Sequence, residues 1–172
     1  MRRMRHLAPR GSRWRTGLIG IAVASLVLAC MPGRDAAAAG TDVAIAVVVG
    51  KGQSPAAPLS PALVAGIFAR KRQLWSDRST IVPVNLPASH TLRRNFSRWV
   101  FDKTPEEMQA YWNDQYFHGV VPPPVLASEE AVLRFVAATP GAIGYVSVCA
   151  VDRRVDVVAV VQPSEGAAPC SH

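Results

Sequence analysis

The sequence predicts an α/β protein, and three observations indicate this class. Runs of strand length, rich in β-branched residues, alternate along the chain with runs whose apolar residues recur at helical spacing. Two of the helical runs open with Ser or Thr followed by Pro, at residues 60–61 and 104–105, which is typical of helix starts. The 172 residues, less a leader of 39, leave 133, which suits one domain with a single core. A chain in which strands and helices alternate belongs to the α/β class.

The N-terminal segment has the pattern of a secretion signal. MRRMRHLAPRGSRWR carries six arginines and no acidic residue, and the apolar stretch TGLIGIAVASLVLAC follows it. This stretch is too short to span a bilayer comfortably as a helix. We expect cleavage after AAA, before Gly40, which makes residues 1–39 the signal peptide and residues 40–172 a periplasmic or secreted domain. The alternative is cleavage before Cys30, in the loose lipoprotein box VLAC, which leaves a lipid-anchored protein.

The charge of the chain lies mostly in this leader. The whole sequence has 19 Lys and Arg against 12 Asp and Glu, but the residues after the leader have 12 against 11. The pI near 10.0 is therefore a property of the targeting signal. A nearly neutral domain lacks the basic footprint of a nucleic-acid binder, so no nucleic-acid partner is expected.

The first half of the domain contains two predicted strands around one helix. The continuous apolar run Val43–Val49 predicts a strand buried on both faces. After a loop, Ser60 is the expected N-cap of a helix that reaches Lys71, with Pro61 at its first position. A turn then leads to the predicted strand Thr80–Asn85.

The second half adds three helices and two strands. The first helix ends at Phe101, and the second starts at Thr104, where Glu107 completes a capping box. The third, SEEAVLRFVAAT, has acidic residues in its first turn. We expect AIGYVSV and VDVVAVV to form a hairpin joined near residues 152–154.

Two cysteines after the leader, Cys149 and Cys170, could pair in an oxidising compartment. In the predicted hairpin Cys149 lies near the turn, so the C-terminal segment must run back along the sheet to reach it. The segment after Val161 can stretch about 30 Å, which exceeds a strand of about 20 Å. Two unpaired thiols remain the alternative.

The stretch NLPASHTLRRNF joins a predicted strand to a predicted helix. Backbone N–H groups point outward at such a junction, where anions bind readily. Ser89 and Thr91 could equally be a helix cap, and Arg93 and Arg94 could be a solvated helix face. The sequence therefore predicts either an anion site or a capped turn here.

Four segments together resemble a known family. AVVVGKGQ, LSPALVAGIFARKRQLWSD, IVPVNLPASHTLRRNF and ASEEAVLRFVAATPGAIGYV are similar to one lobe of the periplasmic phosphate-binding proteins, the solute-binding components of phosphate ABC transporters. The resemblance covers residues 43–160. It implies a single mixed-sheet lobe of the type II periplasmic-binding-protein fold, with helices on both faces. It also implies phosphate or another oxyanion as ligand, and a membrane permease or a sensor protein as partner.

The resemblance also assigns an anion site. It places Ser89 and Thr91 on the family's Ser-Gly-Thr loop, with His90 in place of the glycine. The family's arginine falls opposite Asn85, so its bidentate clamp is missing from the usual place. Arg93 and Arg94, in the first turn of the helix, could supply positive charge from a different angle.

The family's acidic neighbour falls opposite Pro87 in this sequence. Family members also close two lobes over the ligand, whereas this chain has residues for one. A degenerate lobe that binds a protein partner and no small ligand is therefore the competing interpretation.

Other functional classes find little support in the sequence. His90 and His118 have no partner at ligand spacing, so neither a metal nor another cofactor is expected. Ser89 beside His90 resembles part of a hydrolase site, but no G-x-S-x-G elbow or orienting acid accompanies it, so an enzyme is not expected. We expect the aromatic residues Trp75, Trp99, Tyr111 and Trp112 to pack against the sheet.

Overall fold

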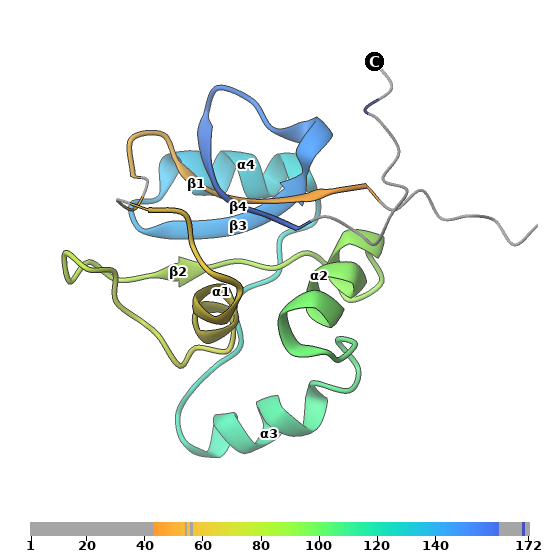
Figure 1. The fold of residues 1–172 in the computed structure, drawn as a ribbon. Helices are drawn as coiled ribbons and strands as arrows, with labels where there is room; N and C mark the ends of the chain where they lie inside the picture. The colour runs from red at the N-terminus through yellow and green to blue at the C-terminus, as the bar shows by residue number, and fades with distance from the viewer. Residues whose placement is uncertain (1–42, 54, 56, 162–169, 171–172) are drawn as a thin grey trace, which may run out of the picture. The chain divides into compact units, whose positions relative to one another are not determined.

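The structure is a computed structural model that describes residues 43–53, 55, 57–161 and 170. The predicted leader and its two cleavage positions lie outside these residues. The elements in chain order are β1 (Ile45–Gly50), α1 (Pro61–Phe68), β2 (Val82–Pro83), α2 (Thr91–Phe101), α3 (Gln109–Phe117), α4 (Glu129–Ala138), β3 (Ala142–Ser147), the short 3-10 helix η1 (Val148–Ala150) and β4 (Val155–Val161) (Figure 1).

The four strands form one mixed sheet in the order β2-β3-β1-β4. β1 is antiparallel to both of its neighbours, whereas β2 runs parallel to β3. All six residues of β1 are buried, because strands flank it on both sides and helices cover the sheet. The strand predicted at Val43–Val49 is thus confirmed as one of the two inner strands of the sheet, at Ile45–Gly50.

The predicted hairpin between the last two strands is wrong. β1 lies between β3 and β4 and is antiparallel to each, so β3 and β4 run in the same direction. Two parallel strands cannot be joined by a tight turn, because the chain must first return to the end of the sheet at which the earlier strand began. The segment from η1 to Arg154 makes this return, and Ala150 and Val151 pack against the core on the way.

This strand order also places the cysteines differently from the prediction. Ile45 pairs with Ser147 of β3 on one side and with Val161 of β4 on the other. The C-terminal ends of β3 and β4 therefore lie at the same end of the sheet. Cys149 follows the end of β3 and is joined to Cys170 by a disulfide. The C-terminal segment therefore starts near Cys149 and need not run back along the sheet.

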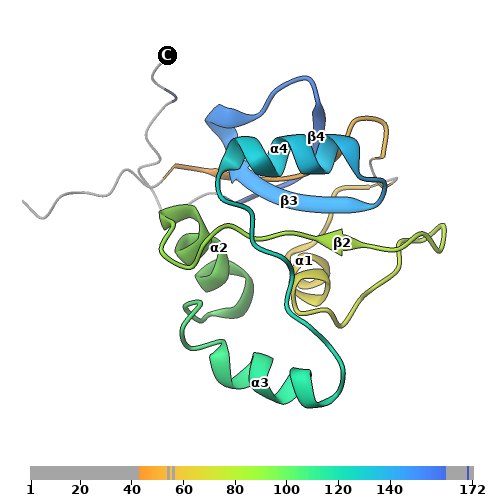
Figure 2. The same ribbon diagram turned by 180° about the vertical axis from the view of Figure 1, so that it is seen from behind.

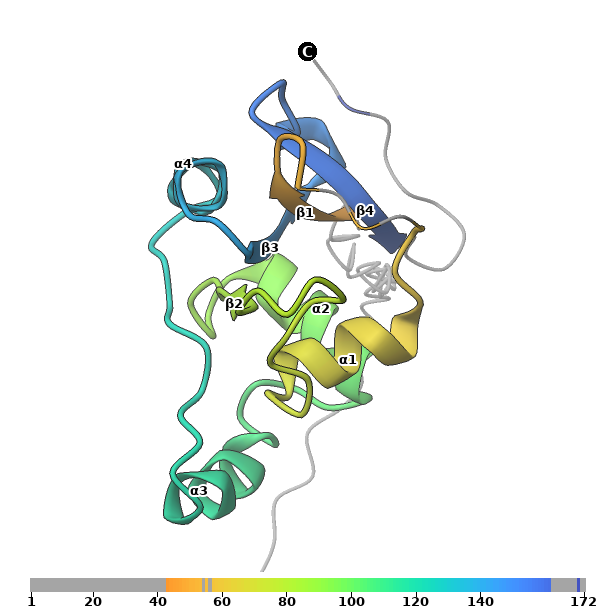
Figure 3. The same cartoon turned by 90° about the vertical axis from the view of Figure 1, so that its left-hand side faces the viewer.

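Helices cover both faces of the sheet, which confirms the predicted fold class (Figures 2 and 3). On one face α4 packs so closely on β3 that a Cβ atom at Gly144 would lie 2.6 Å from Val132 Cγ1. On the other face Tyr145 stacks on Phe96 of α2, with ring centroids 3.8 Å apart, and meets Phe68 of α1 edge-on at 5.8 Å. Successive residues of β3 thus face opposite layers, as a strand requires.

The strand predicted at Thr80–Asn85, just before the predicted anion site, is shorter in the structure. β2 contains Val82 and Pro83, and its ladder continues through the Val84 N–H, which donates to the Ile143 carbonyl at 2.9 Å. Pro83 lacks an N–H but costs no ladder bond, because β2 lies at the edge of the sheet and Val82 and Val84 supply the donors to β3. Asn85 then forms an isolated parallel bridge with Val125.

The helix starts confirm some of the local predictions. Ser60 caps α1 and Ser128 caps α4, each with its hydroxyl accepting from a backbone N–H three residues later. The capping box also forms, since the Thr104 N–H donates to Glu107 Oε2 at 2.7 Å and the Glu107 N–H donates to Thr104 Oγ1 at 3.3 Å. It encloses a turn, however, and α3 begins only at Gln109.

The aromatic residues divide between the sheet and α3. Trp75 and Trp99 pack against the core, as predicted. The prediction was wrong for Tyr111 and Trp112, because they lie on α3, where no residue is buried. Tyr111 instead donates a hydrogen bond from its hydroxyl to the Ala69 carbonyl at 2.8 Å, which ties α3 to the end of α1.

Candidate anion-binding loop

The segment Asn85–Arg94 leaves β2 and enters α2, and we call it the anion loop. A tight turn sets its shape, because the His90 N–H donates to the Pro87 carbonyl at 2.9 Å. Ser89 and Thr91 are exposed on either side of His90. The turn brings the serine and threonine of the predicted site to the open end of α2.

His90 is the N-cap of α2, where Ser89 or Thr91 was the expected cap. Its backbone is extended, with φ −72° and ψ 133°, and its Nδ1 atom accepts from the Leu92 N–H at 3.2 Å. A ring nitrogen that accepts cannot carry the proton, so the neutral ring is protonated at Nε2. The imidazole therefore offers a donor to a ligand at the helix start.

The backbone donors of the anion loop differ in part from the prediction. The His90 N–H is used by the turn and the Leu92 N–H by the cap. The N–H groups of Ser89, Thr91 and Arg93 form no hydrogen bond with the described residues. Donors thus remain on both sides of His90, and those of Thr91 and Arg93 belong to the first turn of α2.

Arg93 is turned inward, although the sequence placed it among the ligand contacts. The residue is 8% exposed and forms no salt bridge within the described part of the chain. Burial raises the pKa of the Tyr145 hydroxyl, and the nearby positive charge of Arg93 opposes the rise. Arg93 therefore brings a positive charge, with no carboxylate partner among the described residues, to the first turn of α2.

Arg94 is the arginine that lies against the anion loop. Its Nη1 donates to the Ser89 carbonyl at 2.7 Å, so the guanidinium folds back over the helix start. Helical side chains tilt toward the N-terminus, which allows a residue in the first turn to reach the preceding loop. The sequence named Arg94 beside Arg93 but could not distinguish the inward side chain from the outward one.

Asn85 stands where the resemblance places an arginine in the family. Its side chain is buried, and its Oδ1 atom accepts from the Tyr145 hydroxyl at 3.4 Å. The same hydroxyl accepts from the Leu86 N–H at 3.2 Å. Sequence reasoning missed Tyr145 as a support of the anion loop, because the tyrosine belongs to a distant strand and no local signal connects the two.

Several other chemistries lack a structural basis in the described residues. Ser89 and His90 share no hydrogen bond there, and the His90 Nδ1 atom already accepts from the backbone. No group of three His, Cys, Asp or Glu residues in the described ranges could hold a metal ion. Likewise, none of the helices in this part of the chain has the length and apolar character to cross a bilayer.

Most of the chain matches a known protein family. The family model of the PBP superfamily domain matches residues 41–168. No curated protein sequence matches this chain.

Solved structures share the fold. One is a phosphate ABC transporter substrate-binding protein from Clostridium perfringens with bound phosphate, at 22% identity and a TM-score of 0.55 over 69% of this chain and 46% of that one. Another is an ABC-type phosphate transport receptor from Vibrio cholerae, at 20% identity and a TM-score of 0.52 over 69% of this chain and 47% of that one. The chain thus spans about half the length of these proteins.

Proposed function

The chain belongs to the PBP superfamily, and from this premise we propose that it is an exported module that binds phosphate or a similar oxyanion at the anion loop. The observation that carries the proposal is the set of donors at the start of α2. The N–H groups of Thr91 and Arg93 are open there, and the Arg94 guanidinium lies on the adjacent Ser89 carbonyl. A helix N-terminus with open donors and nearby positive charge attracts anions.

Each residue of the proposed site has a distinct role. Ser89 and Thr91 are exposed and donate from their hydroxyls, and the His90 Nε2–H donates from the side. Arg93 acts from below through its charge, because its side chain is buried near Tyr145. Arg94 is half-buried against the anion loop, where a rotation of its side chain would exchange the Ser89 carbonyl for a ligand oxygen.

The solved structures support the ligand class and the kind of partner. Phosphate is bound in the Clostridium perfringens protein, and both proteins belong to ABC phosphate transport. We therefore propose a membrane permease or a sensor protein as partner, and binding without catalysis. Since one lobe leaves a face of the ligand in water, binding should be weak.

Export is the remaining part of the proposal. Residues 1–39 serve as a signal peptide that delivers residues 40–172 to the periplasm or the medium, with a lipid anchor at Cys30 as the alternative. The disulfide between Cys149 and Cys170 supports an oxidising destination. Mass spectrometry of the exported protein distinguishes the two forms, because an acylated Cys30 adds the mass of its lipid.

Amide NMR with phosphate tests the binding proposal. Titration of the ¹⁵N-labelled protein with sodium phosphate should move the signals of Thr91 and Arg93 along saturating curves, because their N–H groups face the ligand. Sodium chloride at the same ionic strength is the control. If phosphate and chloride move the same signals equally, the anion loop is a capped turn and the lobe acts through a protein partner.

A further inference from the structure

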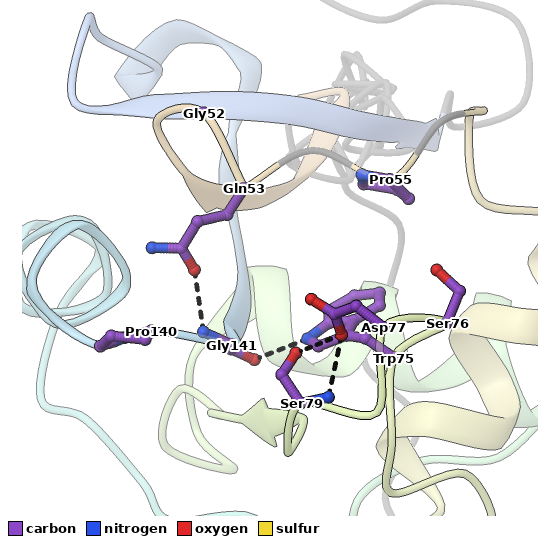
Figure 4. A pocket seen from close by; sticks show the side chains of 9 residues that line it. All are labelled: Gly52, Gln53, Pro55, Trp75, Ser76, Asp77, Ser79, Pro140 and Gly141. Atoms are coloured by element: carbon purple, nitrogen blue, oxygen red, sulfur yellow. Dashed lines mark hydrogen bonds between the residues drawn. The ribbon is translucent and has the colours of Figure 1, made fainter.

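A cavity of about 440 Å³ lies beside Gly141, at the start of β3 (Figure 4). Its walls come from the loop after β1, the turn Trp75–Ser79 and the turn at Gly141. Gly141 directly precedes β3, whereas the anion loop follows β2, which runs parallel to β3. The cavity and the anion loop are therefore separate sites.

Gly141 fixes the three walls relative to one another. Its N–H donates to Gln53 Oε1 at 2.8 Å, and its carbonyl accepts from Trp75 Nε1 at 3.1 Å. Its φ is +77°, and a Cβ atom there would lie 2.1 Å from the Thr80 carbonyl oxygen. Because only glycine fits this position and both of its peptide groups are bonded, the cavity walls are pre-organised.

Two acceptor oxygens, from Asp77 and Ser79, are available on the side of the cavity formed by Trp75–Ser79. The Trp75 Nε1 donor is used by Gly141, and Figure 4 shows the Gln53 amide nitrogen turned away from Trp75 and Asp77. Asp77 Oδ1 accepts from both the N–H and the hydroxyl of Ser79, at 2.9 and 2.6 Å. Its other oxygen points into the space below Gln53 (Figure 4).

The cavity also carries one negative charge. Asp77 is the charged residue among the described lining residues, and it forms no salt bridge with a described residue. The hydrogen bonds from the Ser79 hydroxyl and then from its backbone N–H lower the pKa of Asp77, so the carboxylate stays ionised in neutral solution. Trp75 and Pro55 supply apolar surface beside this charge.

We propose that this cavity binds the primary ammonium group of a small alkylamine. The free Asp77 oxygen and the Ser79 hydroxyl oxygen accept its N–H groups, and its alkyl stem lies against Trp75 and Pro55. A cation suits a cavity that places a carboxylate beside an indole ring. A primary ammonium suits it better than a quaternary one, because only the former has N–H donors for these acceptors.

An NMR titration of the full chain with butylammonium chloride tests the proposal. The amide signals of Ser79 and Gly141 and the indole signal of Trp75 should shift with saturation. Tetramethylammonium chloride has the same charge without N–H groups, and 1-butanol has the stem without the charge. Each should bind several-fold more weakly than butylammonium, because the first cannot donate N–H hydrogen bonds and the second has no charge to pair with Asp77.

The variant Asp77→Asn keeps an oxygen acceptor for Ser79 and removes the charge. We expect it to bind butylammonium about tenfold more weakly, while the control Asp114→Asn, on α3, binds it like the parent. Equal binding of the two cations to the parent, unchanged affinity in Asp77→Asn, or no shift at the three signals would overturn the proposal. If Asp77→Asn fails to fold, the comparison of the two cations on the parent decides.

Discussion

The hydroxyl of Tyr145 accepts a hydrogen bond from the Leu86 N–H at 3.2 Å, and this bond ties the middle of the sheet to the anion loop. The same hydroxyl donates to Asn85, and the positive charge of Arg93 acts on it. One buried phenol thus supports the end of β2 and the first turn of α2. The position of the candidate site depends on a residue outside it.

Tyr145→Phe should therefore destabilise the protein. The substitution keeps the ring that stacks on Phe96 but leaves the Leu86 N–H and the Asn85 Oδ1 atom without their shared partner. The loss should be about 1–3 kcal/mol in the free energy of unfolding, measured by urea denaturation. Tyr116→Phe is the matched control, because Tyr116 is 66% exposed and should change stability little. Equal stability of Tyr145→Phe and the parent would contradict this support.

Alkaline pH should weaken the fold through the same tyrosine. Burial raises the pKa of Tyr145 above its ordinary value of 10.0, so the unfolded chain releases this proton at a lower pH than the folded protein. The protonated Tyr145 hydroxyl therefore makes its full contribution to the free energy of unfolding below about pH 10, and this contribution is lost as the pH rises above that value. The free energy of unfolding, measured between pH 8 and about pH 11, should fall less steeply in Tyr145→Phe than in the parent. Parallel curves for the two proteins would exclude this titration.

The close approach of α4 to the sheet should be sensitive to a single methyl group. A Cβ atom at Gly144 would lie 2.6 Å from Val132 Cγ1 and 3.1 Å from Val84 Cγ2. Gly144→Ala should cost about 1–3 kcal/mol in the free energy of unfolding, because both neighbours are fully buried. A Cβ atom at Gly66, in α1, would meet no atom closer than 4.0 Å. Gly66→Ala should therefore raise the free energy of unfolding by about 0.5–1 kcal/mol. Thermal or urea unfolding of the two variants would show shifts of opposite sign.

The anion loop should accept sulfate as well as phosphate. Residues 85–94 include two arginines and no Asp or Glu, so the loop offers donors and no carboxylate to accept a proton from the ligand. A tetrahedral anion that carries no proton can accept from these donors and has no hydroxyl that needs an acceptor. Isothermal titration should give dissociation constants for sulfate and phosphate within about tenfold of each other, and phosphate should bind more tightly at pH 8 than at pH 6. Binding of phosphate alone would point to an acceptor elsewhere in the site.

Local signals predicted much of the fold, because the features concerned act over a few residues. The apolar run of β1, the serine caps of α1 and α4 and the acidic first turn of α4 depend on neighbours in sequence. The strand order does not. β3 and β4 looked like a hairpin since only a short segment separates them, yet β1, from the other end of the domain, pairs between them.

The candidate site was predictable in place but only partly in detail. The junction of a strand and a helix located the anion loop, and Ser89 and Thr91 lie on it as expected. The capping role of His90 was not expected, because histidine is outside the usual set of capping residues. The inward turn of Arg93 brings its charge near Tyr145, whose position only the folded sheet determines.

Thermal unfolding with phosphate tests the proposed oxyanion binding most directly. With a dissociation constant on the order of 1 mM, about 10 mM phosphate stabilises the folded state by about 1.4 kcal/mol, which raises the melting temperature by roughly 4–7 °C over chloride at matched ionic strength. Ser89→Asp places a carboxylate beside the open N–H of Thr91, so it should be at least as stable without phosphate and should lose the shift.

The control Asn113→Asp, on α3, adds the same charge away from the anion loop and should keep the phosphate shift. A rise in the parent and in the control, together with its loss in Ser89→Asp, is the predicted result. A parent that melts at the same temperature in phosphate and chloride, or a Ser89→Asp variant that keeps the full shift, would contradict oxyanion binding at the start of α2.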